Sequence, residues 1–137
     1  MGNRWRKAQK RTKIMACVVL GATVAALTGG IYLLSALRDY KNGVAAIQVQ
    51  NIDLAAIGDG EYFGDCDTGL VGARVRVVVE NHRITEIELL EHKNGRGEAA
   101  ESLPDEIIRE QRIDVDAVSG ATSSSKVIQE AIIKALN

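Results

Sequence analysis

The residues best suited to chemistry are concentrated in one short segment, residues 114–125, with the sequence Asp-Val-Asp-Ala-Val-Ser-Gly-Ala-Thr-Ser-Ser-Ser. Five hydroxyl side chains lie close to Gly120, and an apolar pattern with helical spacing begins directly after them. Glycine permits a tight turn and a close approach of a ligand. Unpaired N–H groups at the start of a helix attract anions. The segment therefore predicts an anion site, and phosphate suits it best.

The same residues also permit an interpretation without a ligand. Ser and Thr are common N-caps, and a cap stabilises a helix end by itself. Four consecutive hydroxyl residues, Thr122–Ser125, exceed what one cap requires. The residues alone leave both interpretations open. A Walker loop is not indicated, because no Gly-Lys-Ser/Thr follows the glycine.

The remaining polar residues do not indicate a catalytic triad or a metal site. His82 and His92 have no nucleophile at a recognisable spacing. Cys17 and Cys66 are too far apart in the sequence for a zinc finger or a disulfide-rich scaffold. No acid–base pair for turnover of a substrate is evident. The pattern favours a carrier or binding protein over a stand-alone enzyme.

Two residues outside the segment need an interpretation of their own. Cys66 lies between Asp65 and Asp67, and acidic neighbours raise the pKa of a thiol, so we expect this thiol to be unreactive. His92 follows a predicted strand, and we expect it to be an exposed, neutral loop residue.

The elements that position the segment form a small α+β domain. We expect a strand and its exit at 45–57, a short strand at 61–64 and a strand pair at 71–79 and 84–90. In the pair, buried and exposed residues alternate. The alternation slips between Ile84 and Ile87, which predicts a bulge. Two helices complete the domain, a short one at 104–111 and a final one whose apolar stripe runs from Val127 to Leu136. We therefore expect a small antiparallel sheet with helices packed on one side, preceded by one transmembrane helix.

The N-terminal part of the chain has the pattern of a membrane anchor. The first 13 residues hold six basic residues and no acid: Arg4, Arg6, Lys7, Lys10, Arg11 and Lys13. An uncharged run of 24 residues follows, from Ile14 to Leu37. At about 1.5 Å per residue a helix of this length spans about 36 Å, enough to cross a hydrocarbon core of about 30 Å. We expect a basic tail at 1–13, a transmembrane helix at 14–37, a polar linker at 38–43 and a domain at 44–137.

Charge predicts the orientation of this anchor. Basic residues before the span place the tail in the cytoplasm and the domain outside the cell membrane, with Trp5 as an interfacial anchor. A cleaved secretory signal is the competing interpretation. The run is longer than a usual signal core, which favours an uncleaved anchor in lipid. The remaining 124 residues hold 11 basic and 18 acidic residues, so the domain is acidic and does not attract nucleic acid.

Several motifs identify a resemblance to a known family. Residues Asp116–Thr122, Asp-Ala-Val-Ser-Gly-Ala-Thr, match the flavinylation motif Asp-x-x-Ser/Thr-Gly-Ala-Thr. The pattern Asp-Gly-x-Tyr-x-Gly occurs at Asp59–Gly64, and a glutamine precedes the motif as Gln111. The outer part of the chain thus resembles the FMN-binding domain family. Such domains occur in flavin-carrying subunits of Rnf-type and Na⁺-pumping NADH:quinone reductase complexes, and in extracellular electron-transfer proteins.

The resemblance implies a cofactor and roles for individual residues. FMN would be joined through a phosphoester to the hydroxyl of Thr122, and Asp116 would help the attaching enzyme to recognise the motif. Three residues would shape the loop: Ser119, Gly120 and Ala121. Ser123 and Ser125 would contact the phosphate or the ring, with capping as the alternative role for each. Tyr62, or apolar residues of the hairpin, would cover one face of the ring.

The resemblance also implies a function and partners. The protein would be a membrane-anchored carrier that relays electrons between membrane redox partners. These partners would be a flavin transferase that uses FAD and a divalent metal, a membrane redox complex or quinone-linked donor, a downstream electron carrier, and membrane lipid. Two alternatives remain. One is a tethered sensor or regulator that binds FMN without shuttling electrons, and the other is a flavin-free assembly module in which the hydroxyl run is only a cap.

Overall fold

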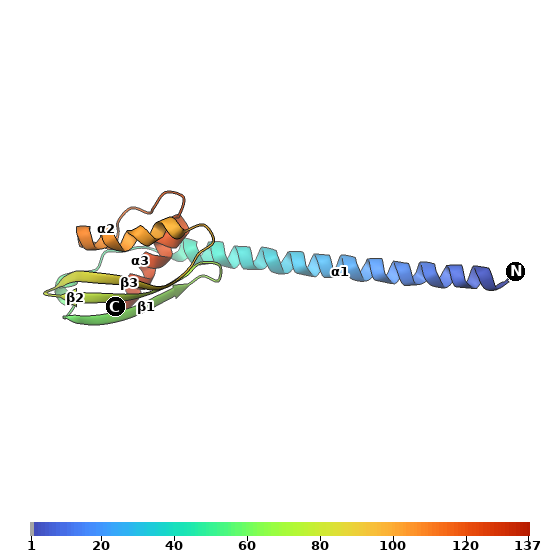
Figure 1. Cartoon of the computed structure of the whole chain (residues 1–137), viewed down its shortest axis with the longest axis horizontal. Coiled ribbons are helices and arrows are strands. Elements are labelled where there is room, and N and C mark those ends of the chain that lie inside the picture. The colour runs from blue at the N-terminus through green and yellow to red at the C-terminus, as the bar shows by residue number, and fades with distance from the viewer. Residues whose placement is uncertain (1) are drawn as a thin grey trace. The chain divides into compact units, whose positions relative to one another are not determined.

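The computed structural model describes residues 2–137, with side chains described for residue 15 and from residue 17 onward. The chain divides into two units, Met1–Arg38 and Asp39–Asn137. The C-terminal unit holds the sheet and two of the three α-helices (Figure 1). The basic tail and Trp5 lie outside the residues whose side chains are described, so the structure does not test the predicted orientation.

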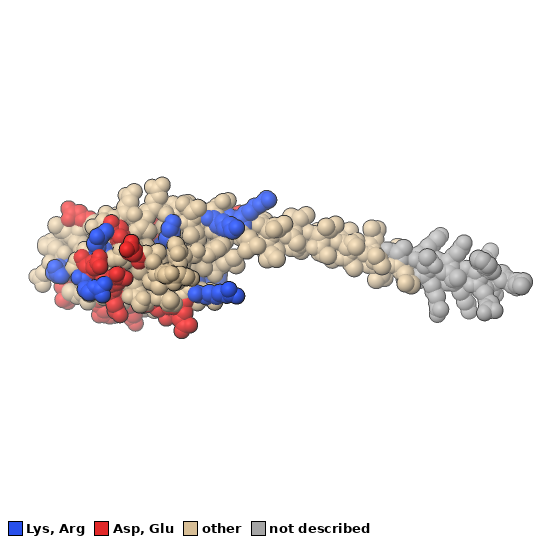
Figure 2. Space-filling view, turned by 90° about the horizontal axis from the view of Figure 1, so that it is seen from above, with Lys and Arg blue, Asp and Glu red and all other residues tan. Residues whose placement is uncertain are grey.

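Helix α1, Gly2–Ala46, contains the uncharged run. From Cys17 onward it is long and apolar enough to cross a membrane, although a signal sequence meets the same criteria. The hydroxyls of Thr23, Thr28 and Ser35 bond back to the helix itself, as when Thr28 Oγ1 donates to Val24 O at 2.9 Å. Such internal bonding suits lipid, which offers polar groups no partner. The described part of the run carries no charged atoms on its surface (Figure 2).

The predicted polar linker at 38–43 is helical in the structure. Helix α1 continues through it to Ala46, and its residues from Asp39 onward belong to the C-terminal unit. A β-carbon added at Gly43 would lie only 3.3 Å from Thr68 Cγ2. Glycine therefore lets the end of the helix pack closely against the loop that carries Thr68.

The predicted strand at 45–57 is wrong. Residues 47–53 have no regular secondary structure and pair with no strand, and the short 3₁₀ helix η1, Leu54–Ala56, follows. Alternating apolar residues were the signal for a strand, but Ile47, Val49 and Ile52 pack against the core as partly buried side chains without a ladder. A side chain holds the segment instead, because Asn51 Oδ1 accepts from Ile113 N at 3.1 Å.

Three antiparallel strands form the sheet in the order β1-β2-β3: Gly60–Asp67, Gly72–Glu80 and Arg83–Lys93. The predicted bulge is confirmed, because Val78 pairs with Glu86 and Val79 with Ile84, leaving Thr85 as the extra residue. Strands β2 and β3 are joined by Asn81 and His82, both with positive φ (52° and 60°). Such values suit the two-residue turns that match the twist of a hairpin.

The helices cover one face of the sheet, as predicted (Figure 1). Helix α3, Thr122–Leu136, packs against β1 and β2, and α2, Leu103–Glu110, packs against β3 after the 3₁₀ helix η2, Glu98–Ser102. The inward side chains of β2 are fully buried between them: Val75, Val77 and Val79. The opposite face is wet and charged, with Arg76 Nη2 2.5 Å from Glu86 and Arg76 Nε 2.8 Å from Glu88. The domain is therefore α+β with one core.

One glycine explains how closely α3 approaches the sheet. Gly64 is the last residue of the Asp-Gly-x-Tyr-x-Gly pattern, and a β-carbon there would lie 2.1 Å from Ala131 O and 2.5 Å from Ala135 N. Both atoms belong to the backbone of α3 and cannot move aside. Glycine at this position therefore fixes the distance between β1 and the helix that carries the hydroxyl segment.

Candidate functional site

Helix α3 begins without a side-chain cap. Its N-cap residue is Ala121 (φ −128°, ψ 29°), which has no side-chain acceptor. Alanine is a poor N-cap, so the first N–H groups of the helix are left for solvent or a ligand. Capping does not account for the hydroxyl segment. The turn before the helix uses Gly120 at φ 80°, a conformation that other residues rarely adopt.

Two buried polar side chains of α3 hold the segment that leads to this turn. Ser125 is fully buried; its hydroxyl accepts from Val118 N and donates to Ala121 O, both at 3.0 Å. One turn later, Gln129 Nε2 donates to Ile113 O at 2.9 Å and to Val115 O at 2.8 Å. Together they satisfy backbone groups of an extended segment that has no strand partner.

The side chain of Gln111 likewise satisfies backbone groups, here at the edge of the sheet. Its amide nitrogen donates to Ile84 O at 2.8 Å, and its amide oxygen accepts from Ile84 N at 2.9 Å. The side chain thus occupies the place of a neighbouring strand at the edge of β3. This contact gives a structural role to the glutamine that precedes the motif.

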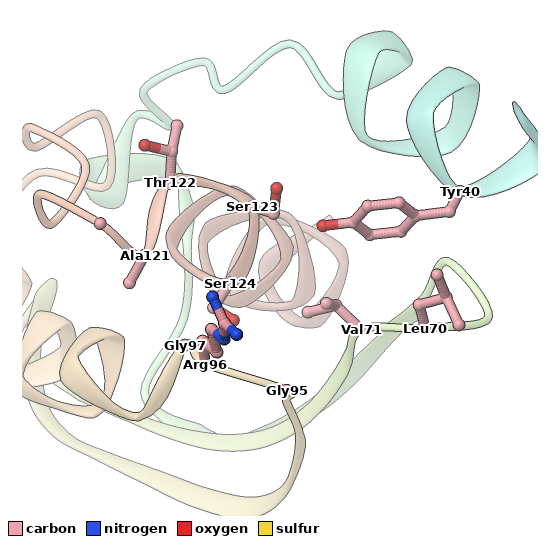
Figure 3. A pocket seen from close by; sticks show the side chains of 11 residues that line it. Tyr40, Leu70, Val71, Gly95, Arg96, Gly97, Ala121, Thr122, Ser123 and Ser124 are labelled. Carbon is pink, nitrogen blue, oxygen red and sulfur yellow. The ribbon is translucent and has the colours of Figure 1, made fainter. Parts of the chain in front are cut away.

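A cavity of about 550 Å³ lies at the start of α3 (Figure 3). Its size is typical of a site for a small molecule or cofactor. Eleven residues line it: Tyr40, Leu70, Val71, Gly95, Arg96, Gly97, Gly120, Ala121, Thr122, Ser123 and Ser124. One part of the lining is polar and cationic, and another part is apolar and aromatic.

Arg96 brings a positive charge to the cavity from the loop between β3 and η2. Its side chain has no ion-pair partner among the described residues. The next residue, Gly97, is buried, and a β-carbon there would lie 1.9 Å from Ser124 Oγ. Glycine therefore lets this loop close against the first turn of α3.

His92 is not the exposed loop residue that we expected. Its side chain is 4% exposed, and its Nδ1 lies 2.9 Å from Glu101 Oε1 and 3.0 Å from Asn94 Nδ2. Its Nε2 is buried without a hydrogen-bond partner. Because His92 lies next to the last residue of β3 and Glu101 lies in η2, the contact links the two elements that flank the loop of Arg96. His92 pairs with Ala73 on β2, and this register turns the His92 side chain inward. The sequence pattern predicted that the strand ends at residue 90, so it gave no direction for this side chain.

The structure brings together four of the predicted site residues: Gly120, Ala121, Thr122 and Ser123 all line the cavity. Ser119 and Asp116 are exposed and do not line it, and Ser125 is buried behind it. Tyr62 also lies outside the lining, and its hydroxyl donates to Gly58 O at 2.8 Å. Tyr62 is thus a residue of β1 whose hydroxyl holds the turn before that strand.

Several lining residues were missed by the sequence analysis. Arg96 had a signal, since it lies between two glycines in a loop, and Ser124 is a neighbour of Thr122 in the motif. Ser124 is 2% exposed and faces the cavity. Tyr40, Leu70 and Val71 had no such signal, because only folding brings them to α3.

Four ionisable groups outside the cavity have shifted pKa values, and those of Cys66 and Asp114 concern residues discussed above. Burial raises the pKa of the Cys66 thiol, and Glu130, Asp65 and Asp67 add to the shift while Lys134 opposes it. The predicted direction is confirmed, although burial outweighs the acidic neighbours. The hydrogen bond from Arg112 lowers the pKa of the Asp114 carboxyl, which keeps this residue ionised near the start of the motif.

The lining fits an organic cofactor that carries a phosphate. The uncapped start of α3, the hydroxyls of Thr122 and Ser123, and the guanidinium of Arg96 suit a phosphate, while Tyr40 and Leu70 suit an aromatic ring. The site therefore defines a small α+β cofactor-binding domain.

The comparisons with known proteins name the cofactor. The family model of the FMN-binding domain matches residues 70–137, and this domain of the chain belongs to that family. Its cofactor is FMN. No curated protein matches the chain. The match covers β2, β3, α2 and α3 and begins within the loop that lines the cavity.

Proposed function

We propose that the protein is a membrane-anchored flavoprotein that carries electrons, with FMN joined covalently to Thr122. The position of Thr122 supports this proposal most directly. It is the first residue of an uncapped helix, its side chain is exposed, and it lines the cavity. An attaching enzyme has access to such a hydroxyl, whereas the neighbouring Ser124 and Ser125 are buried.

The attachment is a transfer from FAD. The hydroxyl oxygen of Thr122 attacks the phosphorus on the FMN side of the pyrophosphate, the bond to the AMP phosphate breaks, and AMP leaves. The hydroxyl proton passes to a base of the flavin transferase, and a divalent metal on that enzyme offsets the charge of the pyrophosphate. No oxidant or reductant is needed. The exposed Asp116 is available to the transferase, since it does not line the cavity.

The chain then holds the phosphodiester in place by charge and hydrogen bonds. The N–H groups at the start of α3 and the guanidinium of Arg96 both favour a negative charge there. Ser125 and Gln129 keep the loop in its turn, so the site is formed before the phosphate arrives. A covalent bond retains the cofactor in an extracytoplasmic location, where free flavin is diluted.

FMN supplies one- and two-electron redox chemistry when bound. The residues that line the cavity include no His, Asp, Glu, Cys or Lys. Proton transfer to a substrate at this site would therefore depend on hydroxyl groups, above all the phenol of Tyr40. This lining supports a carrier over an enzyme with a substrate of its own.

The apolar run in α1 supports the membrane part of the proposal. An uncleaved anchor would keep the domain at the outer surface of the membrane, with the basic tail in the cytoplasm. Its partners there would be a membrane redox complex or quinone-linked donor, and a further carrier as acceptor. The acidic domain offers charge complementarity to a carrier with a basic face.

The experiment that tests the covalent bond is mass spectrometry of the full chain expressed with a flavin transferase. Wild type and Ser123→Ala should gain the mass of an FMN group less water, and Thr122→Ala should not. Ser123→Ala is the matched control because it removes the adjacent hydroxyl of the same cavity. Unmodified wild-type protein from a competent host would refute the covalent proposal.

A further inference from the structure

Tyr40 lies outside the region that the family model matches, yet it lines the FMN cavity. It belongs to the last turns of α1 and follows Leu37, the final residue of the uncharged run, by three positions. Its side chain is partly buried and packs against the core of the C-terminal unit. In Figure 3 its hydroxyl points toward Ser123 across the cavity.

We propose that Tyr40 forms an aromatic wall of the flavin site and contacts the isoalloxazine ring, so that the end of α1 completes the site. The proposal rests on FMN occupying this cavity. The phosphate end is assigned to the start of α3 and to Arg96. The ring must then lie against the apolar part of the lining, where Tyr40, Leu70 and Val71 meet. Tyr40 is the aromatic residue in that lining, and stacked or edge-on contacts between aromatic rings are favourable.

The structure also shows what holds Tyr40 in place. One helical turn later, Gly43 packs against Thr68, with 3.3 Å between the position of an added β-carbon and Thr68 Cγ2. Thr68 is bonded to Val71, because its N–H and its hydroxyl both donate to Val71 O at 2.8 Å. The end of α1 is therefore held in a fixed position against the loop that supplies Leu70 and Val71 to the cavity.

Flavin fluorescence provides a test that does not depend on electron transfer to a partner. A tyrosine in contact with a flavin ring quenches its emission, and a phenylalanine does not, because the benzene ring is much harder to oxidise than a phenol. In the flavinylated full chain in detergent, Tyr40→Phe should raise the emission severalfold and leave its anisotropy unchanged. Tyr40→Ala should also raise the emission but lower the anisotropy, because the wall is lost.

Tyr62→Phe is the matched control. Tyr62 is also partly buried in the same domain, but its hydroxyl bonds to Gly58 O and its side chain does not line the cavity. This variant should leave the emission at the wild-type value. Equal emission from Tyr40→Phe and wild type would overturn the inference.

A second measurement separates this inference from the covalent proposal. Free FMN is titrated into full-length chain prepared without a flavin transferase. Wild type should quench the added FMN, and Tyr40→Phe should bind it with severalfold less quenching. If wild type quenches free FMN but stays unmodified when it is expressed with a flavin transferase, the contact with Tyr40 is supported and the bond to Thr122 is refuted. A wild type that neither carries nor quenches FMN would overturn both.

Discussion

Ser125 and Gln129 are buried polar residues whose only described partners are backbone groups of the segment leading to the motif. The hydroxyl of Ser125 and the amide of Gln129 replace the hydrogen bonds that a neighbouring strand would give this segment. Ser125 thus has a structural role, and the contact to phosphate or ring that the resemblance implied for it has no support in its position behind the cavity.

Ser125→Ala should lower the free energy of unfolding by about 1–3 kcal/mol, because Val118 N–H loses its partner in a buried site. Urea unfolding followed by far-ultraviolet circular dichroism measures the change. Ser123→Ala is the control, since Ser123 makes no hydrogen bond of its own to hold the loop among those described, and it should stay within about 0.5 kcal/mol of wild type. Equal losses for both variants would contradict the assigned role of Ser125.

The Cys66 thiol should be slow to alkylate in the folded protein. Its side chain is 6% exposed, and burial raises its pKa above the ordinary value of 9.0. The unfolded chain ionises first as the pH rises, so this group contributes stability below pH 9.0 that is lost above it. We expect iodoacetamide to modify a Cys17→Ser variant slowly at pH 8 and rapidly in denaturing urea. Rapid modification of the folded protein would contradict the burial of Cys66.

The contact between β1 and α3 depends on the absence of a side chain at one position. Gly64→Ala should destabilise the domain by about 3 kcal/mol or more, because the new methyl group meets the backbone of Ala131 and Ala135. Thermal unfolding measures the loss. Gly95→Ala is the control, since an added β-carbon there has open space around it. A Gly64→Ala variant as stable as this control would contradict the observed packing distance.

The loop that carries Arg96 is braced by the His92–Glu101 contact. Glu101→Ala removes the carboxylate 2.9 Å from His92 Nδ1 while leaving the cavity lining unchanged. We expect faster amide hydrogen exchange at residues 94–97 in this variant than in wild type. Glu98→Ala, which alters an exposed acid in the same 3₁₀ helix, should leave the exchange unchanged. Unchanged exchange in both variants would show that the contact does not hold the loop.

The anchor interpretation predicts the fate of the whole chain in the cell. If α1 is an uncleaved anchor, protein purified from membranes should retain the N-terminal residues of α1 together with its cofactor and should resist extraction by carbonate. A cleaved signal would remove the N-terminal residues and release the domain. Mass spectrometry of membrane and soluble fractions distinguishes the two outcomes.

The alternation of β2 and β3, the bulge between Ile84 and Ile87, the two later helices and the apolar run were all predictable from local patterns. Each depends on spacing within a few residues, where backbone geometry decides which side chains share a face. The motif around Thr122 was predictable for a similar reason, because Gly120 and the hydroxyl run are neighbours in the chain.

Contacts between distant parts of the chain decided the rest. The alternation at 45–57 predicted a strand, but its apolar residues pack against the core without pairing with any described strand. His92 was expected in solvent, and only its register with Ala73 turned it inward. Tyr40 reaches the cavity because Gly43 packs against Thr68, a residue 25 positions later. The local sequence pattern does not predict such contacts, since they form only when the core brings the end of α1, the β1–β2 loop and α3 together.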